Sequence, residues 1–462
     1  MTKAGPIFCP GPVGRRDFLR GGFLGLTGLG LGDLLRARAQ AADVNRSAKP
    51  ETACIFIWLG GGPSQFETYD MKPDSPAEYR GEFRPIQTSV PGIEICEHLP
   101  MQARVADRFS LIRSCSHVSG NHENGTQHFL TGRKANRDAD KSSVHPDIGA
   151  VFKRLNPVSR QAVPNYVSVH CNGFEYGGTG YLGQACMPFR VCTDKGDNPT
   201  EQWTNWGVGA FRVGNDKELA LLRERSNLRD SFDRLRRKLD TDGLMAAMDG
   251  YDLEALRMST GDQAQRAFEV WREPEQVRER YGRTRAGQEF LLARRLVEHG
   301  VGFVTVDFRN VEGALAHTWD DHATGWNIFE QMRLRLPVYD QALSALIEDL
   351  FARGLDQRVL VVACGEFGRT PRISVSEGRP GRDHYPATMS ILVSGGGLRM
   401  GQVVGSTSLK GEEPKDRPLT PADFLSTVYK FLGINPRHEF LDRAGRPLPI
   451  LPDGEPIGEL LG

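Results

Sequence analysis

The sequence lacks an excess of charge of either sign. Its 462 residues include 58 lysine and arginine side chains and 58 aspartate and glutamate side chains, so the formal net charge is zero. A balanced charge provides no bulk electrostatic attraction to nucleic acid or to an anionic membrane, and we predict neither as a partner. Apolar residues make up 39% and charged residues 25% of the chain, which is typical of a globular protein.

Zinc-ribbon cysteine spacing is also missing. None of the eight cysteines forms a CxxC or CxxH pair, so the sequence predicts no small structural zinc module. Without Cys9, which lies in the predicted leader, seven irregularly spaced cysteines remain, and this odd number argues against a complete disulfide framework. The spacing leaves open one bridge among Cys171, Cys186 and Cys192.

No apolar run predicts a stable membrane span. The segment from Gly21 to Leu35 is short and rich in glycine, which does not suit a bilayer-crossing helix. It follows the pair Arg15-Arg16 and precedes the small residues Ala37 to Ala41, the order of a twin-arginine signal peptide. We therefore expect residues 1–41 to be removed after passage through the twin-arginine export machinery. The mature protein would then work in a periplasmic or extracellular space.

The remaining chain predicts an α/β fold with a mostly parallel central sheet flanked by helices. Short apolar runs rich in β-branched residues alternate with helical patterns, as in parallel α/β proteins. We expect one domain over residues 42–440, with a charged helical insert at about 216–296, followed by a proline-rich tail at 441–462. The predicted strands are Ala53–Leu59, Ser110–Arg113, Tyr166–His170, Val301–Val306, Val359–Ala363 and Met389–Val393.

Carboxylates, imidazoles and an arginine follow the ends of these strands. In an open α/β sheet, loops at the carboxyl ends of parallel strands form one edge, so these groups are candidates for a shared site. The alternation of an extended segment places Asp320 and His322 on the same side. The candidate groups are Glu67, Asp70, His117, His122, Thr126, Asp320, Asp321, His322, Glu366, Arg369, Asp383 and His384.

This mixture of groups predicts a site for a divalent metal ion. Imidazole together with carboxylate suits zinc or manganese, whereas a set dominated by carboxylates suits magnesium or calcium, and the sequence leaves the identity open. Such an ion polarises a phosphoryl or sulfuryl oxygen. Arg369 or Arg382 would contact the oxyanion through its two-pronged guanidinium. Each histidine taken alone is equally compatible with a structural role.

Several motifs resemble those of a known family. GGPSQFETYDMKP, HENGTQHFLTGR, HTWDDH, GEFGRT and GRDHYP, behind a twin-arginine leader, are similar to a bacterial family of unknown function grouped with the alkaline-phosphatase-like and sulfatase-like hydrolases. The similarity runs from about Ala53 to Leu432. It implies an alkaline-phosphatase-like fold and a metal centre. The ligands that it implies are Glu67 or Asp70 after the first strand, Asp320 and His322, Glu366 after the penultimate strand, and His384 last.

The sequence departs from that superfamily at three places. The first strand ends in Leu59-Gly60-Gly61 without an immediate aspartate, and Phe367 stands where the second member of an Asp-His pair would be. The segment around His122 and Thr126 lacks the Cys-x-Pro-Ser-Arg core from which sulfatases make formylglycine. A formylglycine mechanism is therefore not expected, and Thr126 or a metal-bound water is the nucleophile candidate.

Two functions follow from these features. The first is an exported metal-dependent hydrolase that acts on a phosphate or sulfate ester of a small molecule or glycan, with His122, Thr126 and Arg369 as catalytic residues. The alternative is a non-catalytic secreted protein that keeps the fold and binds an anionic glycan. Two metals about 4 Å apart would favour hydrolysis. A single metal with too few ligands, or with no hydroxyl near it, would favour binding.

Overall fold

A mixed sheet of eight strands carries the site, in the order β14-β4-β13-β8-β1-β7-β5-β6. The computed structural model describes residues 52–135, 141, 143–157, 163–169, 174, 176–191 and 266–461. β13 runs antiparallel to both of its neighbours, and the other neighbouring pairs are parallel. The strands are β1 (Ala53–Trp58), β4 (Phe109–Cys115), β5 (Tyr166–Val169), β6 (Phe189–Val191), β7 (Phe303–Asp307), β8 (Val359–Cys364), β13 (Met389–Gly395) and β14 (Val403–Val404).

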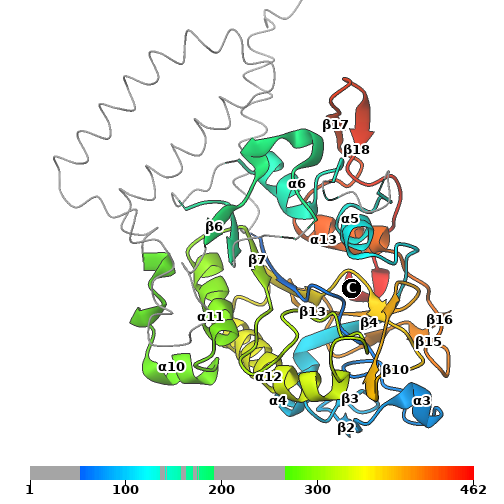
Figure 1. Cartoon of the computed structure of the whole chain (residues 1–462). Helices are drawn as coiled ribbons and strands as arrows, with labels where there is room; N and C mark the ends of the chain where they lie inside the picture. The colour runs from blue at the N-terminus through cyan, green and yellow to red at the C-terminus, as the bar shows by residue number, and fades with distance from the viewer. Residues whose placement is uncertain are drawn as a thin grey trace, which may run out of the picture. The chain divides into compact units, whose positions relative to one another are not determined.

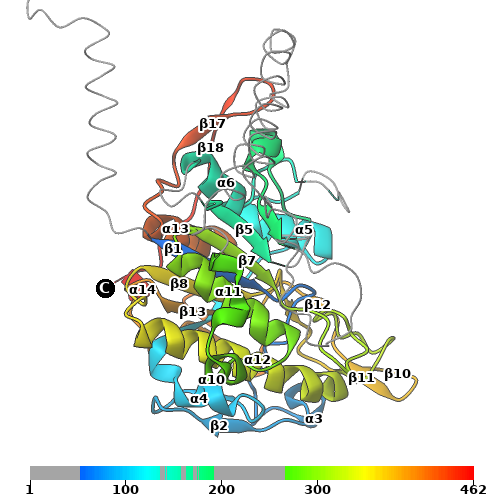
Figure 2. The same cartoon turned by 90° about the vertical axis from the view of Figure 1, so that its left-hand side faces the viewer.

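Helices cover both faces of this sheet, and Figures 1 and 2 show them as two layers with the strands between them. On one side lie α4 (Pro100–Arg104), α11 (Arg285–Glu298) and α12 (Ile328–Ala352), with the short α10 (Glu275–Arg280) beside them. On the other lie α5 (His122–Thr131), α6 (Ile148–Leu155) and α13 (Pro421–Phe431). The predicted α/β architecture, with a mostly parallel sheet flanked by helices, is confirmed.

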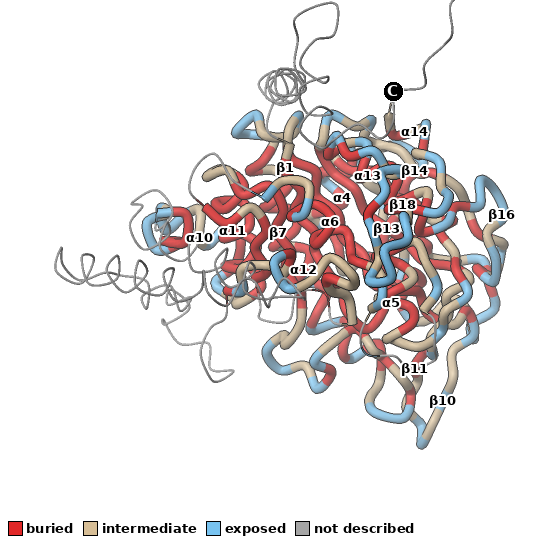
Figure 3. Tube along the Cα trace, turned by 90° about the horizontal axis from the view of Figure 1, so that it is seen from above, coloured by how far each residue is buried: buried red, intermediate tan, exposed pale blue. Residues whose placement is uncertain are grey.

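Strand β1 shows why the sheet is buried on both faces. All six of its residues are buried, and their side chains alternate between the two layers. Ile55 and Ile57 pack toward α11 and α12, whereas Phe56 and Trp58 pack toward the layer of α5 and α6. The period of two in a strand divides one apolar run between two cores. Figure 3 shows these buried elements running through the middle of the fold.

Parts of the predicted insert and of the predicted tail lie in the core. Residues 285–296, the end of the predicted charged insert, belong to α11, which packs against α12 and the sheet with most of its residues buried. Its charges do not keep it at the surface because Arg294 and Arg295 pair with Glu273. The segment called a tail contributes Leu451, Ile457 and Leu460 to the core beneath α13.

Some predictions fall on residues that the structure does not describe. These are the signal peptide at 1–41, the insert from 216 to 265, and two of the three candidate disulfide cysteines, Cys171 and Cys192. The third, Cys186, carries a free thiol. No helix among the described residues has the length and apolar character needed to span a membrane.

Candidate metal centre

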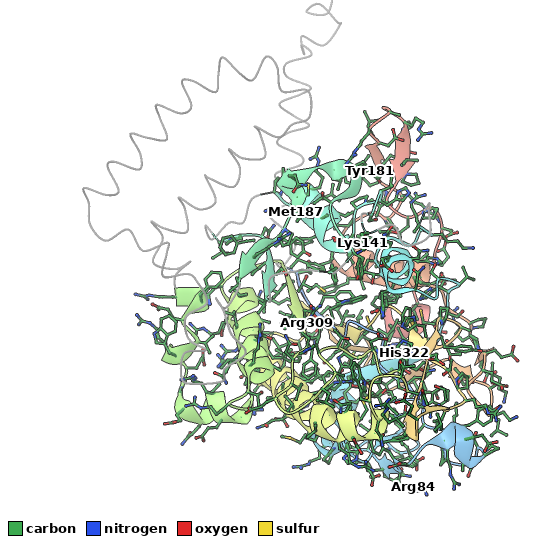
Figure 4. All side chains as sticks on the ribbon, viewed as in Figure 1. Arg84, Lys141, Tyr181, Met187, Arg309 and His322 are labelled. Atoms are coloured by element: carbon green, nitrogen blue, oxygen red, sulfur yellow. The ribbon has the colours of Figure 1, made fainter. Side chains whose placement is uncertain are left out.

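Four side chains meet at the carboxyl edge of the sheet, and Asp320 is at their centre. His322 Nε2 and His384 Nε2 each lie 3.0 Å from Asp320 Oδ1. His122 Nε2 lies 3.3 Å from Asp320 Oδ2. We call Asp320 and these three histidines the four-residue cluster. Their side chains keep between 19% and 31% of their exposure, so a small molecule can reach them. Figure 4 labels His322.

Each imidazole in the cluster is oriented through its other nitrogen. An oxygen acceptor faces every Nδ1, which places the hydrogen on Nδ1 and leaves the Nε2 lone pair directed toward Asp320. This is the arrangement that metal-ligating histidines adopt in proteins. The contacts are His122 Nδ1 to Glu366 Oε1 at 2.7 Å, His322 Nδ1 to Asp383 Oδ1 at 2.8 Å and His384 Nδ1 to the Gly120 carbonyl at 2.9 Å.

The spacing of the ligand atoms fits a small cation. Four ligands at about 2.0–2.1 Å around a tetrahedral zinc ion lie roughly 3.3 Å from one another. The Nε2 atoms of His322 and His384 lie 3.0 Å apart, at the same distance as each lies from Asp320 Oδ1. Ligand atoms of His122, Asp320 and His384 all fall within 4.8 Å of one another. These three side chains form the group that could hold an ion, and His322 lies beside it against His384 and Asp320.

Local structure brings each of these residues to the site for its own reason. His122 is the first residue of α5, where the Asn121 side chain accepts the Asn124 N–H at 2.8 Å and caps the helix. His384 lies in β12 (His384–Tyr385), which pairs with Arg369 of β9 (Gly368–Arg369).

Asp320 and His322 lie in the loop between β7 and α12, and the residue between them anchors that loop. Asp321 points the opposite way and is fully buried against Arg335, with N–O distances of 2.8 and 3.1 Å. The alternation predicted for Asp320 and His322 is therefore present, although this segment belongs to no strand.

Close backbone approach completes the site. Gly61 has φ +104°, and a Cβ at this position would lie 2.6 Å from the Asp320 nitrogen. Its own N–H donates to the Glu366 carboxylate at 2.9 Å. A glycine at this position thus brings the loop after β1 against both the Asp320 loop and the Glu366 side chain.

The structure does not place Arg369 where an ester could reach it. The side chain is completely buried, and its Nη2 donates to Asp320 Oδ1 at 2.6 Å. The rest of the guanidinium donates to the carbonyls of Gly61, Gly62, Trp319 and Arg382. Arg369 therefore joins three loops and positions Asp320, and the predicted oxyanion contact is not supported by this geometry.

Glu366 and Phe367 contact the histidines of the cluster without being candidate ligands themselves. The Glu366 carboxylate is buried and faces His122 Nδ1 rather than the centre of the cluster. Phe367, which stands where the resemblance implies a histidine, packs its ring 4.5 Å from that of His384 and 5.4 Å from that of His122. Glu366 thus orients a candidate ligand, and Phe367 provides an apolar wall.

Glu67 and Asp70 lie outside the cluster, contrary to their predicted place as metal ligands. Glu67 is buried against Arg382, with its Oε1 2.9 Å from Nη2. Asp70 is buried and contacts Lys72 Nζ at 3.0 Å and the Thr407 hydroxyl. The glycine turn after β1 carries the chain past the site before these carboxylates occur, and each has its own cation.

Thr126 is a poor nucleophile in this arrangement. It lies one helical turn after His122 but keeps only 2% of its exposure. An enclosed hydroxyl cannot meet an ester without a rearrangement of α5. His117, also named from the sequence, is buried and contacts the backbone carbonyl of Glu366 through Nε2 at 2.6 Å.

The electrostatics of the cluster favour bound protons when no cation is present. Burial opposes charge on Asp320, but hydrogen bonds from the three histidines and the Arg369 charge hold its pKa well below the usual range. Burial also opposes charge on His122, yet Asp320 and Glu366 raise its pKa to about 10. The hydrogen bond to Asp320 raises the pKa of His322. Burial, helped by Arg369, lowers the pKa of His384. A cation would replace these protons.

Sequence reasoning missed two parts of the site. His122 was assigned to catalysis, whereas its Nε2 faces Asp320 with the other two histidines. Asp383 was a candidate for the shared site but not one of the implied ligands, and it orients His322. Its position directly before His384 was the available signal, although spacing cannot tell which imidazole a carboxylate will face.

A family model matches residues 51–461 of the chain. The chain belongs to the family described as "Protein of unknown function (DUF1501)". No curated protein matches this family member.

Solved structures similar to this family member include a 2-O GAG sulfatase, at 10% identity and a TM-score of 0.37, covering 84% of this chain and 71% of the other. Another is the phosphonate monoester hydrolase of Agrobacterium radiobacter, at 13% identity and a TM-score of 0.37. The match covers 88% of this chain and 78% of the hydrolase chain. A third is a TAB5 alkaline phosphatase mutant with bound Mg, at 10% identity and a TM-score of 0.34. The match covers 84% of this chain and 100% of the phosphatase chain.

Proposed function

We propose that this protein is an exported metal-dependent hydrolase of phosphate or sulfate esters, without a formylglycine nucleophile. The observation that carries the proposal is the convergence of three Nε2 atoms on Asp320 while an oxygen acceptor occupies every Nδ1. Export rests on the twin-arginine pattern in residues 1–41. The substrate would be a small-molecule or glycan ester.

The composition of the cluster favours zinc, with manganese as the next choice. Three imidazoles and one carboxylate are softer ligands than the oxygen sets that hold magnesium or calcium. A divalent ion at such a site polarises a phosphoryl or sulfuryl oxygen and lowers the pKa of a water molecule. Asp320 would balance part of the ion's charge, while Glu366 and Asp383 would keep His122 and His322 in the ligating tautomer.

Water is the nucleophile that this arrangement supports best. Thr126 is enclosed, and Cys115, the cysteine nearest to the nucleophile segment in sequence, is fully buried with a pKa that burial raises strongly. The partly exposed face of the cluster is open to water instead. His122 would then belong to the metal centre rather than act as a separate catalytic group.

The alternative, a secreted protein that binds an anionic glycan without turnover, is favoured by one observation. Two of the three side chains first assigned to chemistry on the ester, Thr126 and Arg369, are buried. Among the described residues there is also a single cluster suited to a metal ion. A hydrolase would have to work with this one centre and with water.

Metal analysis of the purified mature protein, combined with an ester screen, tests the proposal. We expect about one zinc per chain and zinc-dependent hydrolysis of an aryl phosphate, a phosphodiester or an aryl sulfate. His384→Ala should lose metal and turnover together. His317→Ala, at an exposed histidine in the same loop as His322, is the matched control. Metal binding without hydrolysis of any ester would support the binding protein, and unchanged metal content in His384→Ala would remove the metal centre.

A further inference from the structure

The charges around the four-residue cluster limit the charge that a substrate can carry. We propose that the site selects esters with a monoanionic tetrahedral group, namely sulfate monoesters and phosphodiesters, over dianionic phosphate monoesters. This inference rests on the proposed function and names the substrate class for that same site.

Three carboxylates surround the place where an ion would bind. Asp320 belongs to the cluster, and Glu366 and Asp383 contact His122 Nδ1 and His322 Nδ1 at 2.7 and 2.8 Å. Imidazoles that ligate through Nε2 and carry a hydrogen on Nδ1 are neutral, so they add no charge. Together the three carboxylates offset a divalent ion and one further positive charge.

Arg369 is that further charge, and it cannot turn toward a ligand. Among the described residues, it is the one lysine or arginine that contacts the cluster directly. Its guanidinium is completely buried and donates to four carbonyls as well as to Asp320. The site with its ion is therefore close to neutral. Among the residues that the structure describes, none in contact with the cluster offers a free guanidinium for a second negative charge.

A dianion gains little here from its second charge and loses more hydration than a monoanion. A monoanion can use the ion itself, because one oxygen approaches the cation while the other substituents remain neutral or face water. Unit charges separated by about 6 Å near a protein surface still alter an affinity by about tenfold or more. Removal of one of the three carboxylates should therefore shift the preference toward the dianion.

Equilibrium binding to the zinc-loaded full-length mature protein provides the test. At a pH of about 8, dimethyl phosphate is a monoanion and methyl phosphate is a dianion of similar size. We expect dimethyl phosphate to bind roughly tenfold tighter or more by calorimetry. Asp383→Asn should reduce the ratio of the affinity for dimethyl phosphate to that for methyl phosphate several-fold. Glu439→Gln, which removes an exposed carboxylate from the β17–β18 hairpin (Glu439–Leu441 and Pro447–Pro449), should leave it unchanged.

A parallel comparison of activities distinguishes sulfate monoesters from phosphodiesters as substrates. It also distinguishes a failure of the charge selectivity from a failure of the proposed hydrolase function. Turnover of bis(4-nitrophenyl) phosphate is compared with that of 4-nitrophenyl sulfate and 4-nitrophenyl phosphate. Tighter binding of methyl phosphate, equal binding of the two anions, or no binding of either would overturn the charge selectivity, whatever the turnover. Preferential binding of dimethyl phosphate without turnover of any ester would support the charge selectivity and contradict the proposed hydrolase function.

Discussion

The Nε2 atoms of His322 and His384 lie 3.0 Å apart, although 62 positions separate the two residues in the chain. Asp383 faces Nδ1 of one ring and the Gly120 carbonyl faces Nδ1 of the other. With both hydrogens on Nδ1, two lone pairs would face each other, which is unfavourable unless a proton or a cation lies between the rings. The predictions below follow from the contacts that hold this pair together.

Asp320→Asn should weaken zinc binding by roughly 100-fold or more. The substitution keeps the size of the side chain but removes the negative charge that three imidazoles and Arg369 share. Competition with a chromophoric chelator measures the affinity. Asp107→Asn, at an exposed carboxylate after α4, is the control and should retain wild-type affinity. Equal zinc affinity in Asp320→Asn and wild type would contradict the metal centre.

Gly61→Ala should lower both the free energy of unfolding and the affinity for zinc. A Cβ at Gly61 would lie 2.6 Å from the Asp320 nitrogen, and φ is +104°. Gly313→Ala is a matched control, because φ is +80° there and nothing lies within 4 Å. In both variants the positive φ should lower the free energy of unfolding by roughly 1 kcal/mol. Urea unfolding measures this loss. Only Gly61→Ala should also lose zinc. The same zinc affinity in the two variants would show that this contact does not position Asp320.

Arg369→Lys should destabilise the fold by roughly 3 kcal/mol or more. Lysine keeps the charge but cannot reproduce the fork that reaches Asp320 and four buried carbonyls, so several acceptors lose their donors. Urea unfolding in the presence of a chelator isolates this effect from metal binding. Arg372→Lys, three residues along at an exposed position, should be close to neutral. A neutral Arg369→Lys would contradict the structural role assigned to this guanidinium.

Asp340 should make stability depend on pH between about 4 and 7. Its carboxylate accepts the N–H groups of Met101 and Gln102 at 2.8 and 2.7 Å, at the start of α4. Burial raises its pKa to about 6 from 3.8, although these hydrogen bonds oppose the rise. A folded-state pKa above the unfolded value favours the protonated folded protein. The contribution is therefore complete below pH 3.8 and is lost as the pH rises through 6.

Comparison of the wild-type protein with Asp340→Asn isolates this group. We expect the difference in unfolding free energy, wild type minus variant, to fall by roughly 2–3 kcal/mol between pH 4 and pH 7. Urea titrations at four pH values measure it. Removal of an exposed carboxylate in Asp107→Asn should produce a smaller change. A difference for Asp340→Asn that stays constant or grows with pH would contradict the assigned shift.

The strands were predictable because each is a local apolar pattern. Val359–Ala363 and Ala53–Leu59 appear as β8 and β1, within a residue at either end. The pairing of Asp320 with His322 was also a local property, since two residues in an extended segment share a side. Arg369 was misjudged because its sequence context, a charged residue beside glycines, is the same for an exposed ligand-binding group and for a buried one. Burial depends on which other loops meet it.

The sequence by itself determined the α/β class, the order of the strands and helices, and the stretches that supply carboxylates and imidazoles, because hydrophobic periodicity and turn residues act over a few neighbouring positions. Only the tertiary structure decided which of those groups meet. His122 at the start of α5, Asp320 in the loop before α12 and His384 in β12 converge because β4, β7 and β8, the sheet strands that precede them, all end at one edge. Glu67 and Asp70 pass that edge and pair with Arg382 and Lys72. Distances between loops depend on strand order and backbone packing, which no single stretch of residues encodes.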